Sequence, residues 1–106
     1  MRADGKTELS QEKINSVMEL FSNGNYEKAL KTLSFLMETY PNNSLLFNIK
    51  GACYAGLGKL ENAVKSYKEA VLINPKYSKA HYNLGGAFHE LGALDDSVKS
   101  YLKSSF

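Results

Sequence analysis

The chain repeats itself with a period of 34 residues. Residues 58–70 and 92–104 agree at six of 13 positions, including the run Val-Lys-Ser-Tyr. An earlier copy is marked by Gly24, which stands 34 residues before Gly58 and 68 residues before Gly92. A fixed period of this length indicates supersecondary units that stack on one another, because one unit alone cannot bury its apolar face.

Each unit is predicted to form two helices. In the second unit, Phe47, Gly51 and Tyr54 have the spacing of one helix face. Gly58 is expected to end this helix, since glycine adopts the left-handed conformation that often follows a helix. A second helix follows and ends before Pro75, because the residue before a proline is pushed out of the helical region. The chain is therefore expected to be all-α, with six helices.

The period places three repeats at residues 10–43, 44–77 and 78–106, behind residues 1–9, which are expected to form a flexible tail. The first repeat deviates from the other two, as terminal repeats often do. Its apolar residues fit a helix face better when the register is shifted by one residue: Ile14, Val17, Met18 and Phe21. We therefore expect the first helix to be slightly rotated relative to its counterparts.

Large apolar, small and aromatic residues recur in a set order within each unit. In the second unit they are Phe47, Gly51, Tyr54, Gly58, Leu60, Ala63, Tyr67, Ala70 and Pro75. In the third unit they are His81, Leu84, Gly85, Phe88, Gly92, Leu94 and Tyr101. This order, followed over residues 10–106, resembles the tetratricopeptide repeat family. The resemblance implies a right-handed superhelical solenoid of three helix-turn-helix repeats.

No set of residues indicates catalysis, a cofactor or a metal site, so we do not expect an enzyme. Gly85 and Gly86 lie within a predicted helix and not in a phosphate-binding loop. His81 and His89 are eight residues apart, which is not the i, i+4 spacing of helical metal ligands. His81 fills an apolar position and is expected to be packed. Cys53 is interpreted as a small buried hydrophobic residue.

The charge composition argues against a nucleic acid as partner. Lys and Arg total 13 against 11 Asp and Glu, and they are not gathered in one run. A membrane is equally disfavoured, since no apolar stretch approaches the ~20 residues that a membrane-spanning helix needs. The first residues lack the apolar segment of a signal peptide. If the chain is the whole protein, these features predict a cytoplasmic protein.

The family resemblance implies that the first helices of the repeats line a concave groove. Carried across by register, the positions that face a bound peptide are Asn48, Ala52, Lys79, Tyr82, Asn83, Gly86 and His89. An apolar end of the groove would be made by Ile14, Met18 and Phe21, which are alternatively core residues of the shifted helix. The leading hypothesis is a non-catalytic scaffold that binds a peptide or a partner surface in this groove.

One subtype of the family binds the terminal carboxylate of chaperone tails with Lys and Asn one turn apart in successive first helices. Lys79 and Asn83 match that pattern in the third unit. The second unit has Leu45 and Ile49 at these positions, and their side chains cannot donate hydrogen bonds. Binding of a chaperone tail is therefore disfavoured.

Two alternatives of other classes remain open. The chain is alternatively the N-terminal part of a larger enzyme, such as a glycosyl- or sulfotransferase, in which the repeats position substrate or mediate oligomerisation. It is alternatively a self-assembly module, since no helix follows to cover Val98, Tyr101 and Phe106. Ser97 and Ser104 replace alanines of the preceding copy. This change predicts a more polar surface on the face where a further unit would stack. We favour a cut made within a longer array.

Overall fold

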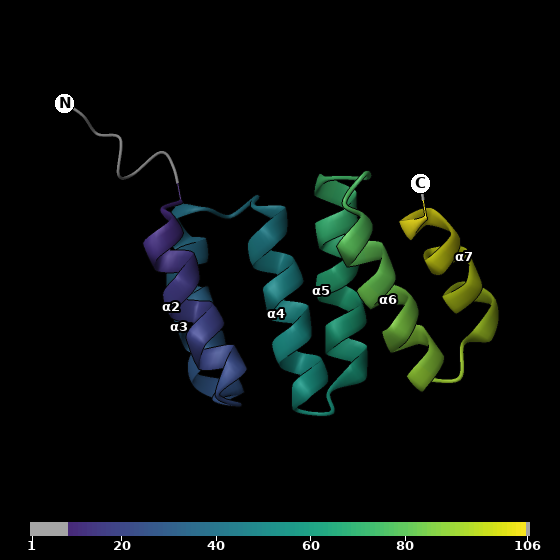
Figure 1. Cartoon of the computed structure of the whole chain (residues 1–106), viewed down its shortest axis with the longest axis horizontal. Helices are drawn as coiled ribbons and strands as arrows, with labels where there is room; N and C mark the ends of the chain where they lie inside the picture. The colour runs from purple at the N-terminus through teal and green to yellow at the C-terminus, as the bar shows by residue number, and fades with distance from the viewer. Residues whose placement is uncertain (1–8, 106) are drawn as a thin grey trace.

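The computed structural model describes residues 9–105, and all regular secondary structure within that range is α-helical (Figure 1). Six helices follow one another: α2 (Gln11–Ser22), α3 (Tyr26–Thr39), α4 (Ser44–Gly56), α5 (Leu60–Ile73), α6 (Ser78–Glu90) and α7 (Leu94–Ser104). The predicted all-α fold with six helices is confirmed. The expected tail, apart from its last residue, lies outside the described residues, and so does Phe106.

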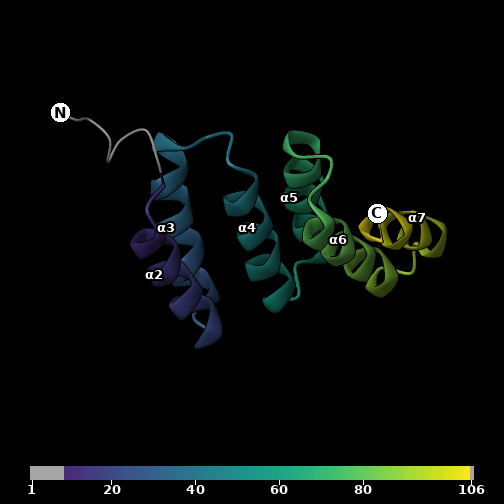
Figure 2. The same cartoon turned by 45° about the horizontal axis from the view of Figure 1, so that its top comes forward.

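Neighbouring helices along the chain pack against one another, so the fold is a row and not a bundle. The pairs α2–α3, α4–α5 and α6–α7 form hairpins, and contacts of α3 with α4 and of α5 with α6 join one hairpin to the next. Figures 1 and 2 show this row, with α2 and α3 at one end and α7 at the other. The Cα atoms span 49 × 28 × 18 Å. This is the elongated arrangement of a solenoid.

The turn inside each hairpin has the same backbone conformation. Gly24, Gly58 and Gly92 have φ angles of +78°, +76° and +81°. At the second of these turns, the N–H of Lys59 donates to the carbonyl of Tyr54 at 2.9 Å, which closes the end of α4. The other two turns repeat this bond at the same distance. The glycines therefore end the first helix of each hairpin by the left-handed capping motif that their spacing predicted.

Replacing Gly58 with alanine should lower the free energy of unfolding by about 1 kcal/mol, because a side chain disfavours the left-handed conformation. An added Cβ meets no atom within 4 Å, so the loss isolates the backbone effect. Gly58→Asn is the control, since asparagine tolerates this conformation better, and it should lose less. Urea denaturation measures both. Equal losses for the two variants would contradict the assignment to backbone strain.

Within each hairpin, a pair of residues sets how closely the two helices approach. In the second hairpin an added Cβ on Gly51 would lie 2.5 Å from the ring of Tyr67, and in the third a Cβ on Gly85 would lie 2.7 Å from the ring of Tyr101. The aromatic ring of the second helix thus packs directly on the backbone of the first helix. This contact explains why glycine stands in the middle of a helix, where it is otherwise unfavourable.

In the first hairpin, different residues occupy the equivalent contact between the two helices. Val17 and Leu33 occupy the positions of the glycine and the tyrosine, and both are fully buried. The larger residue on α2 faces a smaller one on α3, so the summed volume is roughly kept, which cores tolerate best. The predicted shift of register by one residue is therefore wrong. Val17 is the buried residue of α2, while Met18 is 38% exposed.

Two polar residues of the third hairpin are buried with hydrogen bonds. His81 is packed, as interpreted, and its Nε2 donates to the carbonyl of Pro75 at 2.8 Å. Ser97 is buried against α6, where its Oγ donates to the carbonyl of Gly85 at 2.9 Å. The reading of Ser97 as part of a polar stacking face is therefore wrong. Its hydroxyl satisfies a backbone group inside the hairpin.

Candidate functional site

Two adjoining hollows form a groove along the first helices of the hairpins. The hollow nearer the N-terminus measures about 470 Å³ and is lined by Met18, Phe21, Tyr26, Asn48, Ile49, Ala52, Ala55, Gly56, Tyr67, Lys79 and Asn83. The next measures about 340 Å³ and is lined by Ala55, Tyr67, Tyr82, Asn83, Gly86, Ala87, His89, Glu90 and Tyr101. The hollows share Ala55, Tyr67 and Asn83, so they are parts of one surface, which we call the groove.

The structure brings the residues that register assigned to a groove together on one surface. All of the following line one hollow or the other: Asn48, Ala52, Lys79, Tyr82, Asn83, Gly86 and His89. Met18 and Phe21 line the N-terminal hollow, whereas Ile14 is half-buried and lines neither. The 34-residue period places these side chains together because equivalent positions of α2, α4 and α6 face the same side of the row.

The asparagines of the groove are held by hydrogen bonds that the sequence did not reveal. Asn48 is buried, and its Nδ2 donates to the hydroxyl of Tyr77 at 3.4 Å. Its Oδ1 accepts a hydrogen bond from Nδ2 of Asn83 at 3.1 Å. Burial raises the pKa of Tyr77, while the bond from Asn48 lowers it. The buried amide of Asn48 therefore orients Asn83, which lines both hollows.

Aromatic contacts close the N-terminal end of the groove. The rings of Phe21 and Tyr26 meet edge to face with their centroids 5.5 Å apart. The Tyr26 ring also covers Gly56, since an added Cβ there would lie 2.5 Å from it. Tyr26 was missed as a groove residue. The sequence feature that could have identified it is its aromatic side chain, since the other two units have Leu60 and Leu94 at this position.

Tyrosines from the second helices form the floor of the groove. Burial, with smaller effects from the charges of Cys53 and Glu90, raises the pKa of Tyr67 to about 12, so its hydroxyl is neutral at physiological pH. The rings of Tyr82 and Tyr101 lie 5.4 Å apart. Tyr67 belongs to the buried core and also lines the groove, and Tyr101, which is half-buried, lines it as well.

Cys53 lies beneath this floor as part of the core. Its side chain is fully buried, and burial raises the pKa of its thiol to about 11. A thiol with a raised pKa is almost entirely protonated at neutral pH and is a poor nucleophile. The interpretation of Cys53 as a small buried hydrophobic residue agrees with these observations.

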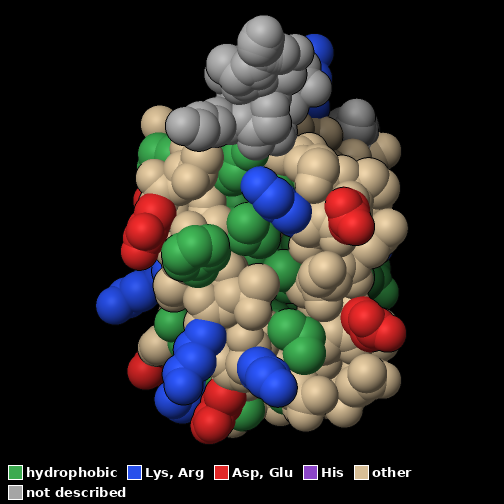
Figure 3. Space-filling model, turned by 90° about the vertical axis from the view of Figure 1, so that its left-hand side faces the viewer, with side chains coloured by type: hydrophobic (Ala, Val, Ile, Leu, Met, Phe, Trp, Pro, Cys, Tyr) green, Lys and Arg blue, Asp and Glu red, His purple; other side chains and the backbone are tan. Residues whose placement is uncertain are grey.

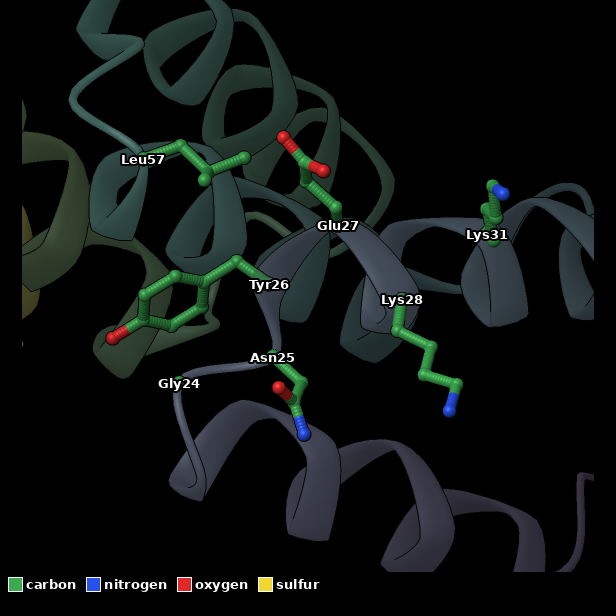
Figure 4. Close-up of a pocket in the computed structure, with 7 residues that line it drawn as sticks. All are labelled: Gly24, Asn25, Tyr26, Glu27, Lys28, Lys31 and Leu57. Carbon is green, nitrogen blue, oxygen red and sulfur yellow. The ribbon is translucent and has the colours of Figure 1, made fainter.

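A further hollow of about 440 Å³ lies at the turn between α2 and α3. Figure 4 shows Tyr26 and Leu57 on one side of it, with the side chains of Lys28 and Lys31 pointing away from them. A similar hollow of about 320 Å³ recurs at the next turn, beside Gly58. Because a similar hollow recurs at the next turn, we attribute it to the shape of the hairpin and assign no function to it.

Residues 9–105 contain neither a candidate metal-binding cluster nor a candidate membrane-spanning helix. No three His, Cys, Asp or Glu side chains in this range gather closely enough to hold a metal ion. None of the helices in this range combines the length and the apolar character needed to cross a membrane.

Comparison with known proteins places the helical hairpins among repeat proteins. A family model described as TPR repeat matches residues 51–92. The peroxisomal targeting signal receptor of Kluyveromyces lactis is 30% identical over 64 residues, which are 60% of this chain and 11% of that protein. Heat shock protein STI1 of Saccharomyces cerevisiae is 34% identical over 66 residues, or 61% of this chain and 11% of that protein. The chain thus spans about a tenth of the length of these relatives.

Solved structures agree with this placement over most of the chain. The second TPR of Spaghetti (RPAP3), bound to the HSP90 peptide SRMEEVD, superposes with a TM-score of 0.82 and is 26% identical. That match covers 88% of this chain and 86% of the other. The Sgt2 TPR domain from Aspergillus fumigatus superposes with a TM-score of 0.84 at 23% identity, covering 90% of this chain and 65% of the other. The latter likeness shows the fold alone.

Proposed function

Because the chain belongs to the tetratricopeptide repeat family, we propose that it is a protein-interaction scaffold which holds an extended peptide segment of a partner protein in the groove. A solved structure with the same fold and 26% identity holds a seven-residue HSP90 peptide, which supports the proposal. The observation that carries it is the continuity of the two hollows from Met18 to Glu90. A continuous groove accommodates several residues of an extended chain.

The chemistry of the groove defines the kind of peptide that fits. Its N-terminal end is apolar, with Met18, Phe21 and Ile49 on the walls, and suits a large hydrophobic side chain. The amide of Asn83 has a donor and an acceptor, as the peptide backbone does. Lys79 adds a positive charge on the same wall and favours an acidic side chain nearby. The proposed ligand is an extended segment with a hydrophobic residue next to an acidic one.

The proposal is tested by selecting peptides from a displayed random library and measuring the affinity of the best one by fluorescence polarisation. Tyr82→Ala removes an aromatic side chain that is 61% exposed at the groove, and it should weaken binding by about tenfold or more. Lys79→Ala should weaken binding less, and less still at high salt. Leu72→Ala, exposed on α5 and absent from the lining of the groove, is the control. Binding that survives both groove variants unchanged would refute the assignment.

We do not expect the groove to hold a terminal carboxylate, although a structure with the same fold holds an HSP90 peptide. At the positions of Lys79 and Asn83, the second hairpin has Leu45, which packs against the core, and Ile49, which is buried. Neither side chain donates a hydrogen bond. We expect the peptide SRMEEVD to bind weakly, and amidation of its carboxyl terminus to change that affinity less than twofold. A loss of tenfold or more on amidation would show that a carboxylate site exists after all.

The alternative function is that of a repeat segment within a larger enzyme. The TPR repeat-containing thioredoxin TTL4 of Arabidopsis thaliana is 35% identical over 65 residues, which are 61% of this chain and 10% of that protein. Its name combines such repeats with a thioredoxin, which supports this alternative function. Reading the gene on both sides of these 106 codons decides the matter, since a catalytic domain encoded on either side would support the alternative and a reading frame without one would exclude it.

A further inference from the structure

The second hollow of the groove, which we call the C-terminal hollow, combines tyrosine rings with one carboxylate. Tyr67, Tyr82 and Tyr101 line it, and so does Glu90. Its lining includes no lysine or arginine, and Glu90 is its one acidic residue. Within residues 9–105 the Glu90 carboxylate takes part in no ion pair. The hollow therefore presents a negative charge that no side chain of the described range neutralises, next to aromatic rings.

Two of these rings meet at an angle. The centroids of Tyr82 and Tyr101 lie 5.4 Å apart, and the ring planes are tilted by 54° to each other, so the rings form a corner and not a flat stack. The face of an aromatic ring carries partial negative charge. A lysine or arginine group within about 6 Å of the ring centroid is attracted to it. Because both rings line the hollow and Tyr82 is exposed, a cationic group of a ligand can reach this corner.

Oxygen atoms lie beside the rings to accept hydrogen bonds from such a group. The pKa of Tyr67 is raised by burial and, to a smaller extent, by the charges of Cys53 and Glu90, which indicates that the Glu90 carboxylate lies near the Tyr67 hydroxyl. The Tyr101 hydroxyl lies over Gly86, where an added Cβ would be 3.6 Å from it. Ammonium and guanidinium groups only donate hydrogen bonds, so a carboxylate and hydroxyl oxygens suit them.

The attraction for a cation in this hollow is local. The chain as a whole carries a formal charge of +2. Figure 3 shows acidic and basic side chains mixed over the end of the row that α2 and α3 form. In the N-terminal hollow the charged residue is Lys79, which lies 11 positions before Glu90 on α6. The groove therefore has a positive and a negative site, about 16 Å apart along the helix.

We propose that the C-terminal hollow binds a basic side chain, arginine or lysine, of the peptide segment held in the groove. The inference rests on the proposed function, since it names a further residue of the same ligand. An extended chain covers about 16 Å with roughly five residues, so the basic residue should stand roughly five positions from the acidic residue that Lys79 favours. Two opposite charges at a fixed separation would define the register in which the peptide binds.

Peptides selected from the displayed random library test the proposal. Those selected by the unchanged chain should share a basic residue roughly five positions from an acidic one. Its uncharged analogue, citrulline for arginine or norleucine for lysine, should weaken binding about tenfold or more in fluorescence polarisation. The same replacement should cost about threefold or less with Glu90→Gln, where the rings alone act on the cation. Glu69→Gln is the matched control, because Glu69 is exposed on α5 and lines neither hollow, and it should respond like the unchanged chain.

A charge reversal gives a second test. Glu90→Lys should bind the selected peptide weakly and should prefer the same peptide with glutamate at the basic position, with circular dichroism confirming that the variant is folded. Selected peptides that lose affinity with Met18→Ala, in the N-terminal hollow, but carry no basic residue or bind Glu90→Gln unchanged, would overturn this inference and leave the proposed function standing. If no peptide is selected, or if no groove variant weakens binding, the proposed function fails and this inference fails with it.

Discussion

Replacing Leu33 with alanine should lower the free energy of unfolding by about 2 to 5 kcal/mol, the range for truncating a fully buried leucine. Leu33 is 0% exposed and belongs to the core cluster formed by α2, α3 and α4. The loss combines the lost burial of three side-chain carbon atoms, which alanine lacks, with the cavity that they leave. Since a domain of this size has a total stability of about 5 to 15 kcal/mol, the variant should be visibly less stable in urea.

Phe35→Ala is the control for this prediction. Phe35 lies two residues further along α3 and is 71% exposed. Its replacement by alanine removes a larger side chain than the replacement of Leu33 does. It should change the stability by less than about 0.5 kcal/mol, as surface substitutions usually do. The measurement is the urea midpoint followed by circular dichroism. A Phe35 variant as unstable as the Leu33 variant, or a Leu33 variant that loses less than about 1 kcal/mol, would contradict the described core.

Alanine at two adjacent glycines of α6 should change stability in opposite directions. At Gly85 the new Cβ would lie 2.7 Å from the rigid ring of Tyr101, and overpacking of this kind costs about 1 to 3 kcal/mol. At Gly86 the nearest atom is the Tyr101 hydroxyl at 3.6 Å, an ordinary contact. Gly86→Ala should therefore gain about 0.5 to 1 kcal/mol from helix propensity. Thermal and urea unfolding of the two variants measure the difference.

A second variant separates steric overlap from other causes of the Gly85 effect. Gly85→Val combined with Tyr101→Leu copies the pair Val17 and Leu33 of the first hairpin into the third. The combination should be more stable than Gly85→Val alone, because the smaller leucine makes room for the added side chain. If Gly85→Ala stabilises the chain, or if the second change brings no recovery, the close contact of ring and backbone is not what holds these helices together.

Most of the fold could be predicted from the sequence because its determinants are local and repeated. Gly24, Gly58 and Gly92 mark the turns by a conformation that glycine adopts readily. The family resemblance then implied that the first helices line a groove, and the 34-residue register carried its positions to Asn48, Lys79 and Tyr82, each of which lines one hollow or the other. No contact had to be known for either step.

The first hairpin shows where this reasoning fails. Apolar residues at positions 14, 17, 18 and 21 predicted a shift by one residue, yet the helix keeps the register, and Val17 faces the core. The pattern on α2 alone could not reveal this, because the deciding fact is that α3 carries Leu33 where the other units carry tyrosine. Compensation between two helices is a property of the pair.

The sequence by itself determined the number of hairpins, the turns and the face that each first helix turns to the groove. The tertiary structure decided which groups meet there: the bond from Asn83 to Asn48 and the ring of Tyr26 over Gly56. The physical reason is that helix geometry follows from neighbours along the chain, whereas contacts of a few ångströms depend on how far apart the helices stand. That spacing is set by all the side chains between them at once.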